Sequence, residues 1–257
     1  MPDLLRALLR ADSVFGLREA NVAVFAALGF RNAYYVSPVV PDRGEGRMMT
    51  NMGFSREWEM AYREAPRGSD LLPDIALRIG TIFRWGKLPA GFTPTAAETA
   101  YLDSLEAWGM ADGIGIPVYG PPARAGFIGL AGPDKPDGLE TADLELLRIA
   151  AETSYLRYCE LIVSQVEEMP RLSSRELDVL HSMAQGRSNA AIARQLSLSQ
   201  ETVDTYVRRI FSKMNVSDRT SAVVKGVVRG LVIASDPEID AAIRARQPPI
   251  PPENDVE

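Results

Sequence analysis

The amino-acid sequence changes character near residue 170, and this change limits the possible folds more than any other feature. Before it, apolar stretches typical of strands are mixed with stretches of helical spacing. After it come four short helical stretches, each opened by a serine that can cap a helix. The run EEMPRLSS at 167–174 breaks the helical pattern between the two parts. The chain of 257 residues therefore predicts two domains, over 1–166 and 173–234, with a linker at 167–172.

The first domain is predicted to be α+β. Helical spacing occurs at 17–30, 55–65 and 95–108, and strand patterns occur at 32–40, 113–120 and 126–132, with a turn-rich loop at 41–46. A long amphipathic helix is predicted from 141 to 168. We expect its apolar face to cover a sheet, and a dimer seam can share that face. The face consists of Leu144, Leu147, Ala151, Tyr155, Tyr158, Ile162 and Val166.

Composition narrows the functional classes. No segment has the roughly 18 uncharged apolar residues of a membrane span. The N-terminal stretch lacks the cleavage site of a secretory signal, and the single cysteine, Cys159, excludes an intrachain disulfide. We therefore expect a cytoplasmic protein without a membrane partner. The tail at 235–257 is acidic and proline-rich, and it is predicted to be disordered.

The charge is distributed unevenly along the chain. Residues 170–235 carry ten Lys and Arg against five Asp and Glu, whereas residues 1–169 carry 16 against 23 and residues 236–257 carry two against six. A basic segment between acidic ones is typical of a nucleic-acid-binding module, although a chance excess of surface arginine would give the same count.

The helical stretches of the second domain predict a four-helix, helix-turn-helix fold. Ser173 and Glu176 have capping-box spacing, Ser188 and Ser199 can cap the second and third helices, and Ser217 the fourth. Only about three residues separate the second helix from the third, as a helix-turn-helix requires. The third helix has an apolar stripe at Val203, Val207, Ile210 and Met214.

The opposite side of the third helix is polar and largely basic. Such a helix fits the major groove, with early side chains near base edges and Arg or Lys on phosphates, although an ordinary solvated helix face looks similar. The candidate DNA-contacting residues on it are Gln200, Glu201, Thr202, Asp204, Thr205, Arg208, Arg209 and Lys213.

The run LSSRELDVLHSMAQGRSNAAIARQLSLSQETVDTYVRRIFSKMNVSDRTSAV resembles the DNA-binding domain of LuxR-type transcriptional regulators. The resemblance rests on an L-[ST]-x-R-E opening, A-x-G-x-S-N, I-A-x-x-L, S-x-x-T-V and a closing K-[LM]-x-V-x-[DS]-R-T. It implies that Ser188, Asn189 and Ser199 also serve DNA binding. The chain departs from the family at Ala191, Asp204 and Tyr206, where acidic, basic and histidine residues are common. Because Asp204 would repel a nearby phosphate, operator preference is not expected to follow that of relatives.

Residues 15–165 resemble the acyl-homoserine-lactone-binding domains of quorum-sensing regulators. The resemblance rests on the segments FRWG and GMADGIGIPV, and on Trp58, Tyr62, Asp70, Trp85 and Gly113 in their order and spacing. It implies an α/β/α sandwich with a central antiparallel sheet in front of the all-α domain.

The residue types suit an acyl-homoserine lactone. The Trp58 indole N–H can donate to the lactone carbonyl, and the Asp70 carboxylate can accept from the amide N–H. Tyr62 and Trp85 would form aromatic walls that exclude water. The alternative is that the aromatic residues are ordinary core and that Asp70 caps a helix.

Three departures bear on the ligand. Leu71 follows Asp70 where the family has proline, Phe54 replaces a tyrosine, and Gly132 aligns with a Ser or Thr. The site is thereby expected to be roomier and less polar than usual, which predicts a long, branched or aromatic acyl group. Phe54, Leu72, Gly113 and Gly132 complete the predicted ligand-binding set.

An enzyme is the alternative from another class. The only histidine, His181, lies in the predicted DNA-binding bundle, and neither a P-loop, a dinucleotide fingerprint nor a metal-ligand spacing occurs in the sequence. We therefore expect a regulator without cofactor. Its expected partners are a small-molecule effector, a two-fold symmetric DNA operator and a second copy of the chain, with RNA polymerase as a further candidate. A regulator of the same architecture that senses another small molecule, or none, stays open.

Overall fold

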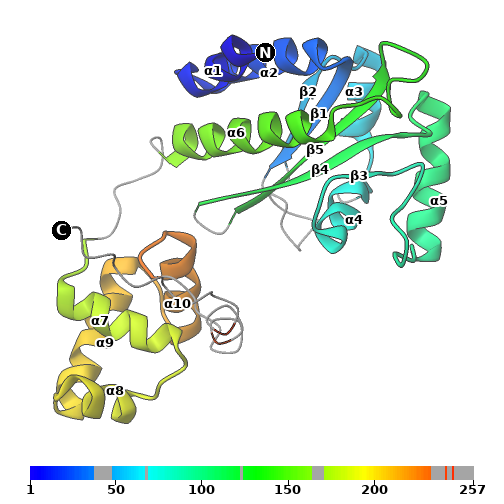
Figure 1. Cartoon of the computed structure of the whole chain (residues 1–257). Coiled ribbons are helices and arrows are strands. Elements are labelled where there is room, and N and C mark those ends of the chain that lie inside the picture. The colour runs from blue at the N-terminus through cyan, green and yellow to red at the C-terminus, as the bar shows by residue number, and fades with distance from the viewer. Residues whose placement is uncertain are drawn as a thin grey trace, which may run out of the picture. The chain divides into compact units, whose positions relative to one another are not determined.

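An antiparallel sheet of five strands organises the first of two units, Met1–Glu167, in the computed structural model (Figure 1). The structure describes residues 1–37, 48–66, 69–121, 124–163 and 171–232, together with residues 241 and 245. The predicted linker at 167–172 lies mostly outside these residues, as do the loop at 41–46 and almost all of the tail at 235–257.

The strands pair in the order β2-β1-β5-β4-β3. They are β1 (Phe30–Ser37), β2 (Met48–Met52), β3 (Phe83–Arg84), β4 (Gly113–Gly120) and β5 (Arg124–Pro133). β4 and β5 pair along their length, with Gly113 opposite Ala131, so the predicted neighbouring strands at 113–120 and 126–132 are confirmed. The strand predicted at 32–40 is confirmed as β1, while residues 38–40 are outside the described part. β2 and β3 escaped sequence prediction because they are short.

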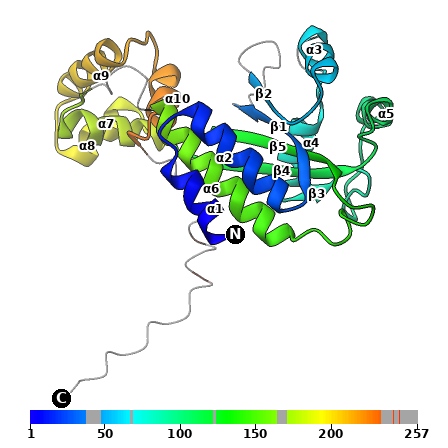
Figure 2. The ribbon, with the colours of Figure 1, turned by 90° about the horizontal axis from the view of Figure 1, so that it is seen from above.

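One face of the sheet is covered by α1 (Pro2–Arg10), α2 (Val14–Ala27) and α6 (Leu144–Val163) (Figure 2). Apolar side chains that alternate along β4 and β5, such as Ile116 and Ile128, share a core with Leu147 and Tyr155 of α6. The predicted long helix therefore does cover the sheet. Leu144 was wrongly assigned to its apolar face, because α6 begins at that residue and leaves its side chain 45% exposed. Val166 is outside the described residues.

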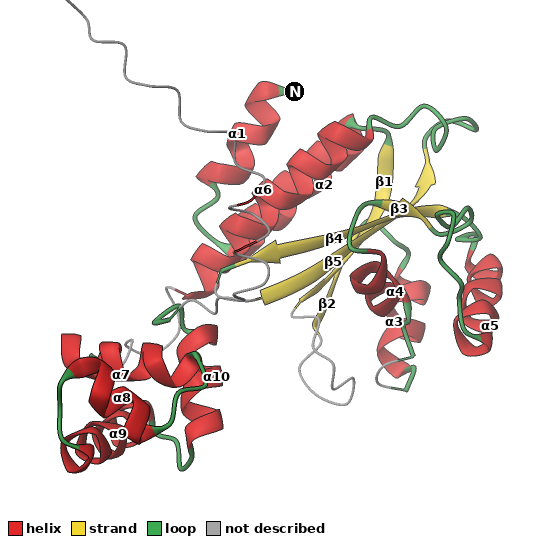
Figure 3. Cartoon of the chain, turned by 60° about the horizontal axis from the view of Figure 1, so that its bottom comes forward, coloured by secondary structure: helices red, strands yellow, loops and turns green. Residues whose placement is uncertain are grey.

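The other face carries α3 (Arg56–Glu64), α4 (Leu72–Ile79), α5 (Ala96–Ser104) and the 3-10 helix η1 (Leu105–Trp108) (Figure 3). Ser55 caps α3 by accepting a hydrogen bond from the Trp58 N–H. The helix predicted at 95–108 is confirmed as α5 followed by η1. Two helical layers around an antiparallel sheet confirm the expected α/β/α sandwich, and they divide its core into two clusters.

The second unit, Glu168–Glu257, contains α7 (Ser174–Ala184), α8 (Asn189–Leu196), α9 (Gln200–Met214) and α10 (Arg219–Val228). Ser173, Ser188 and Ser199 cap their helices as predicted. The prediction of Ser217 as the fourth cap was wrong, because Asp218 accepts the capping bond from the Ser221 N–H. The predicted apolar stripe of α9 is buried throughout: Val203, Val207, Ile210 and Met214. No described helix has both the length and the hydrophobicity needed to span a bilayer.

An ion pair between an exposed lysine and a buried carboxylate connects α7 to α9. Lys213 donates to Oε2 of Glu176 at 2.7 Å, and Glu176, which is 2% exposed, also accepts the Ser173 N–H in a capping box. Burial alone would raise the pKa of Glu176, but Lys213 and Ser173 lower it below the usual 4.5. The carboxylate is therefore part of the folded structure of this unit.

We expect the second unit to lose stability in acid. A carboxyl group with a lowered folded-state pKa stabilises the fold above its unfolded pKa, and this contribution is lost as the pH falls from about 4.5 through the lower folded value. Glu176→Gln should destabilise the unit by about 1–3 kcal/mol at pH 7 and make its stability less dependent on pH below 5. Hydrogen exchange of α7 and α9 peptides measures this. Asp178→Asn, on the exposed side of α7, is the control, and equal acid sensitivity of Glu176→Gln and wild type would contradict the assignment.

Candidate functional site

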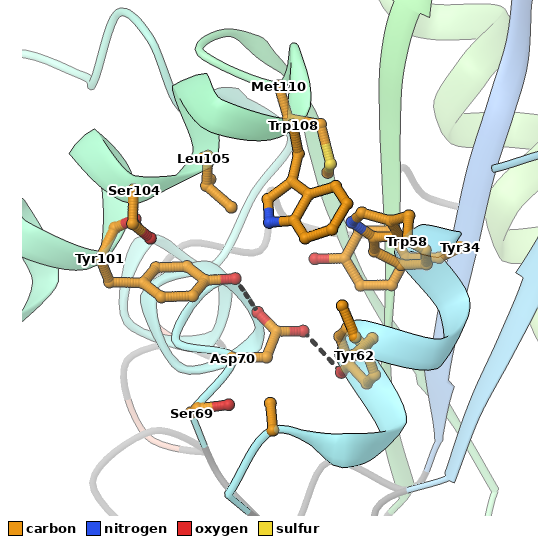
Figure 4. A pocket seen from close by; sticks show the side chains of 12 residues that line it. Tyr34, Trp58, Tyr62, Ser69, Asp70, Tyr101, Ser104, Leu105, Trp108 and Met110 are labelled. Atoms are coloured by element: carbon orange, nitrogen blue, oxygen red, sulfur yellow. Dashed lines mark hydrogen bonds between the residues drawn. The ribbon is translucent and has the colours of Figure 1, made fainter. Parts of the chain in front are cut away.

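A cavity of about 230 Å³ lies between the sheet, α3, α5 and η1 (Figure 4). Aromatic rings and hydroxyl groups dominate its wall. It is lined by Tyr34, Trp58, Ala61, Tyr62, Ala65, Ser69, Asp70, Tyr101, Ser104, Leu105, Trp108 and Met110.

Asp70 is the only ionisable carboxylate on the described wall of this cavity, and the surrounding structure holds it tightly. Tyr62 of α3 donates to Oδ2 and Tyr101 of α5 donates to Oδ1, both at 2.8 Å. The Leu72 N–H at the start of α4 donates to Oδ1 at 3.1 Å. These three bonds join three helices at one carboxyl group that is 7% exposed.

Burial raises the pKa of Asp70, although the hydrogen bonds from Tyr101, Tyr62 and Leu72 oppose that rise. Burial and the neighbouring Asp70 charge also raise the pKa of Tyr101 and Tyr34 well above 10.0. The two phenols therefore keep their protons at neutral pH. Tyr101 donates its proton to Asp70, as Tyr62 does, and the Asp70 carboxylate on the cavity wall can accept further hydrogen bonds.

Trp58 supplies the complementary donor. Its side chain is 7% exposed and stacks on Phe54, with ring centroids 4.3 Å apart. In the described part of the chain its indole N–H has no hydrogen-bond partner, and it is not one of the unpartnered polar atoms that are sealed from solvent. A ligand carbonyl in the cavity would satisfy it.

The structure brings together Trp58, Tyr62 and Asp70 of the eight predicted ligand-binding residues. Phe54 lies behind Trp58, in stacking contact with it, and not on the wall. Leu72 is fully buried in the neighbouring core, and only its backbone reaches Asp70.

The other three predicted wall residues belong to the packing of the sheet. The Trp85 indole donates to the Met110 carbonyl at 2.9 Å, which fixes it within the core. Gly113 leaves the space that the Trp85 ring occupies, since a Cβ there would overlap it. Gly132 is exposed at the end of β5 with a φ of +58°, so it adds no room to the cavity. The expectation of a roomier, less polar site rested partly on Gly132 and is wrong in that respect.

Tyr34, Tyr101 and Trp108 are wall residues that sequence reasoning missed. The alternation of β1 sends Tyr34 and Tyr35 to opposite faces of the sheet, but the sequence does not tell which faces the ligand. Tyr101, Leu105 and Trp108 follow at helical spacing and share one side of α5 and η1, a signal that was available.

Tyr34 closes the cavity towards the sheet. Its ring contacts those of Phe54, Trp58, Tyr62 and Phe127 at centroid distances of 5.4–6.0 Å. It passes over Gly129 of β5, where a Cβ would overlap the ring. Its hydroxyl points towards the centre of the cavity in Figure 4.

A second cavity of about 30 Å³ lies on the opposite face of the sheet. Asn21, Tyr35 and Ser154 line it, and each has a buried oxygen without a partner in the described structure. This volume holds a water molecule or two and no acyl ligand. The larger cavity is therefore the candidate ligand site.

The candidate DNA-binding residues fall into two groups. Ser199, Gln200, Glu201, Arg208 and Arg209 are exposed, and Thr202 and Thr205 lie partly buried beside them. The residues of the second group, Ser188, Asn189, Asp204 and Lys213, form hydrogen bonds or ion pairs with other residues of the same unit.

Lys213 is ion-paired with Glu176, Asn189 bonds to Asp204, and Ser188 caps α8. Lys213 is 41% exposed despite this ion pair, so its contact with phosphate stays a prediction.

The surroundings of His181 and Cys159, the two residues considered for catalysis, do not favour a catalytic role. His181 is exposed on α7, and Cys159 is buried in the α6 core, where burial raises the pKa of its thiol. A buried thiol with a raised pKa is a poor nucleophile.

Comparisons with known proteins define the family. Residues 13–157 match the model of the autoinducer binding domain, and residues 170–225 match that of the bacterial regulatory proteins of the luxR family. Because the first match alone spans more than half of the chain, this protein belongs to the LuxR-type regulators with an autoinducer binding domain. The family is one of transcriptional regulators and not of enzymes, as the sequence predicts.

Individual relatives agree with this assignment. The quorum sensing-dependent transcriptional regulator RpaR of Rhodopseudomonas palustris is 25% identical over 235 residues, which cover 88% of this chain and 95% of RpaR. A putative regulator of Sinorhizobium fredii, y4qH, is 25% identical over 58% of this chain. The chain matches only 46% of the length of y4qH and 42% of NarP of Escherichia coli. The crystal structure of Escherichia coli SdiA has the same fold, with a TM-score of 0.60 at 18% identity, covering 90% of this chain and 97% of SdiA.

Gly129→Ala should destabilise the first unit by about 1–3 kcal/mol, because the added methyl group overlaps the Tyr34 ring. Tyr34→Leu in the same chain should recover part of the loss. Thermal unfolding of the single and double variants measures the coupling. Unchanged stability of Gly129→Ala would show that Tyr34 does not close the cavity.

Proposed function

We propose that this protein binds an acyl-homoserine lactone in the 230 Å³ cavity and controls transcription in response to it. The observation that carries the proposal is the pairing of an unused donor, Trp58, with an acceptor, Asp70, on one aromatic wall. The lactone carbonyl accepts from the Trp58 indole, and the amide N–H donates to Asp70. The name of RpaR, a quorum sensing-dependent regulator, supports this class of signal.

The sequence predicted a long, branched or aromatic acyl group, and the wall supports the aromatic and branched classes. Tyr34, Tyr62, Tyr101 and Trp108 surround the space beyond the polar pair, and rings stack on rings or pack against branched carbons. Because Tyr34 closes the sheet side and the volume is below the usual range of about 300–1,000 Å³, a long straight chain would have to leave through the mouth.

A regulator that senses another small molecule, or none, is the second candidate. One observation favours it: Asp70 already accepts three hydrogen bonds from the protein and needs no ligand to be satisfied. SdiA, which shares the fold, has been crystallised in complex with octanoyl-rac-glycerol, a ligand without a lactone. A glycerol ester belongs in any ligand comparison for this reason.

Aryl-acyl and branched-acyl homoserine lactones should raise the melting temperature of the first unit more than a short 3-oxo-acyl lactone does. Binding stabilises the native state by mass action, and the aromatic wall favours compact apolar groups. Thermal shift with this series and with octanoylglycerol distinguishes the candidates. Tight binding of the short lactone alone would refute the acyl preference.

Asp70→Asn should weaken lactone binding by about tenfold or more, because a hydrogen bond to a charged acceptor contributes about 1.5–3 kcal/mol. Isothermal titration with the aryl-acyl lactone measures it. Asp103→Asn, exposed on α5, is the matched control. If both variants bind as wild type does, Asp70 is not the amide acceptor.

For the DNA-binding step, we propose that two chains associate and place their α9 helices in successive major grooves of a two-fold symmetric operator. Exposed Arg208 and Arg209 supply the phosphate contacts. Binding to chromosomal DNA would place the protein in the cytoplasm, with RNA polymerase as a partner at the promoter.

Arg208→Ala should weaken binding to a mixed-sequence DNA duplex and reduce the slope of log K against log salt by about 1, since one counterion fewer is released. Fluorescence anisotropy across a salt series measures both quantities. The control is Arg175→Ala on α7, whose guanidinium pairs with Asp178. An unchanged slope for Arg208→Ala would show that α9 does not present this face to DNA.

A further inference from the structure

An acidic side chain lies on the margin of the surface that α9 offers to DNA. Asp204 is partly exposed, one helical turn before the exposed Arg208. A carboxylate near a polyanion is repelled, so its presence there needs either a structural or a recognition role.

A relay across three helices holds Asp204 in place. Asn189, at the start of α8, donates to Oδ1 of Asp204 at 2.7 Å and accepts at its own oxygen from Arg219 of α10 at 3.1 Å. Arg219 also donates to the backbone carbonyls of Met183 and Arg187. The position of this carboxylate is therefore fixed by hydrogen bonds that connect α8, α9 and α10.

The relay uses only one of the two carboxylate oxygens. Oδ2 of Asp204 has no hydrogen bond in the part of the chain that the structure describes. Arg208 donates only weakly, at 3.3–3.4 Å, to Thr205 and to the Asp204 carbonyl, and it pairs with no described carboxylate. The Asp204 carboxylate, a fixed acceptor, and the Arg208 guanidinium, an available donor, thus lie one helical turn apart on α9.

We infer that Asp204 is a base-reading residue that selects a cytosine in the operator half-site. In the major groove, the cytosine N4 donor has an acceptor on one side only, O6 of the paired guanine, whereas the adenine N6 donor lies between two acceptors, its own N7 and O4 of the paired thymine, which would repel a carboxylate. Guanine and thymine present acceptors at the corresponding edge. Oδ2 accepts from cytosine N4, and this contact offsets the repulsion from the phosphates.

This inference rests on the proposed DNA binding and extends it to sequence preference. The test is selection from a pool of random DNA duplexes by the full-length protein, followed by sequencing. Wild type should enrich a motif with cytosine at one position of each half-site, preferred by about tenfold over other bases. Asp204→Ala should keep the rest of the motif, lose that preference, and bind unrelated DNA more tightly.

Two further variants separate recognition from structure and from charge. Asp178→Ala removes an exposed carboxylate of α7 that is outside the candidate DNA-contacting set, so it should leave the cytosine preference intact. Asn189→Ala tests the relay: it should reduce the cytosine preference while the Asp204 carboxylate remains.

The outcomes are distinguishable. A motif that Asp204→Ala leaves unchanged, or one with adenine at the affected position, overturns the inference and leaves the proposed function standing. Loss of the whole motif together with the folding of the second unit in Asp204→Ala assigns the residue a structural role only, and also overturns it. A pool that yields no motif contradicts sequence-specific DNA binding itself.

Discussion

The hydrogen bonds to the Asp70 carboxylate are the constraint on which the ligand-binding half depends. A buried carboxylate without partners costs several kcal/mol, and here its donors come from α3, α5 and the first residue of α4. These elements therefore have to stand at fixed distances from one another. The cavity is the space that remains between them, and its polar end is determined by the same three bonds. The packing of this helical layer and the polar end of the cavity thus depend on the same side chain.

The sheet contributes to the cavity through pairs of large and small residues. Tyr34 passes over Gly129, Trp85 occupies the space beside Gly113, and the Phe83 ring lies against Gly115. In each pair an aromatic ring from one segment needs a glycine on a neighbouring strand. Glycine at these positions accommodates a ring in the core and does not enlarge the ligand site. Gly113 and Trp85 are therefore a packing pair: the glycine leaves the space that the Trp85 ring fills, and neither residue lines the cavity.

Local signals were predictable from the sequence, and long-range ones were not. Ser173, Ser188 and Ser199 were found because a cap depends on residues within one turn, and the antiparallel sandwich followed from the resemblance. β3 was not found, since its pairing of Phe83 with Gly115 joins residues far apart in the chain. The Tyr101–Asp70 bond spans 31 positions and has no local signature. Trp58 and Asp70 do lie on the cavity wall, whereas Phe54 and Gly132 do not, because alignment to a motif does not specify which way a side chain points.

The separate cores of the two units limit how a ligand can act. The second unit has its own apolar cluster around Val203 and Ile210 and its own ion pair between α7 and α9, so its fold does not depend on the cavity. In the first unit, by contrast, the Trp58 indole N–H on the cavity wall has no hydrogen-bond partner among the described residues, and a bound carbonyl would accept from it. A ligand therefore shifts the stability of the first unit selectively, by mass action. Under the proposed function, a ligand would act on DNA binding through the folding or association of the first unit, because α9 is held by contacts within its own unit.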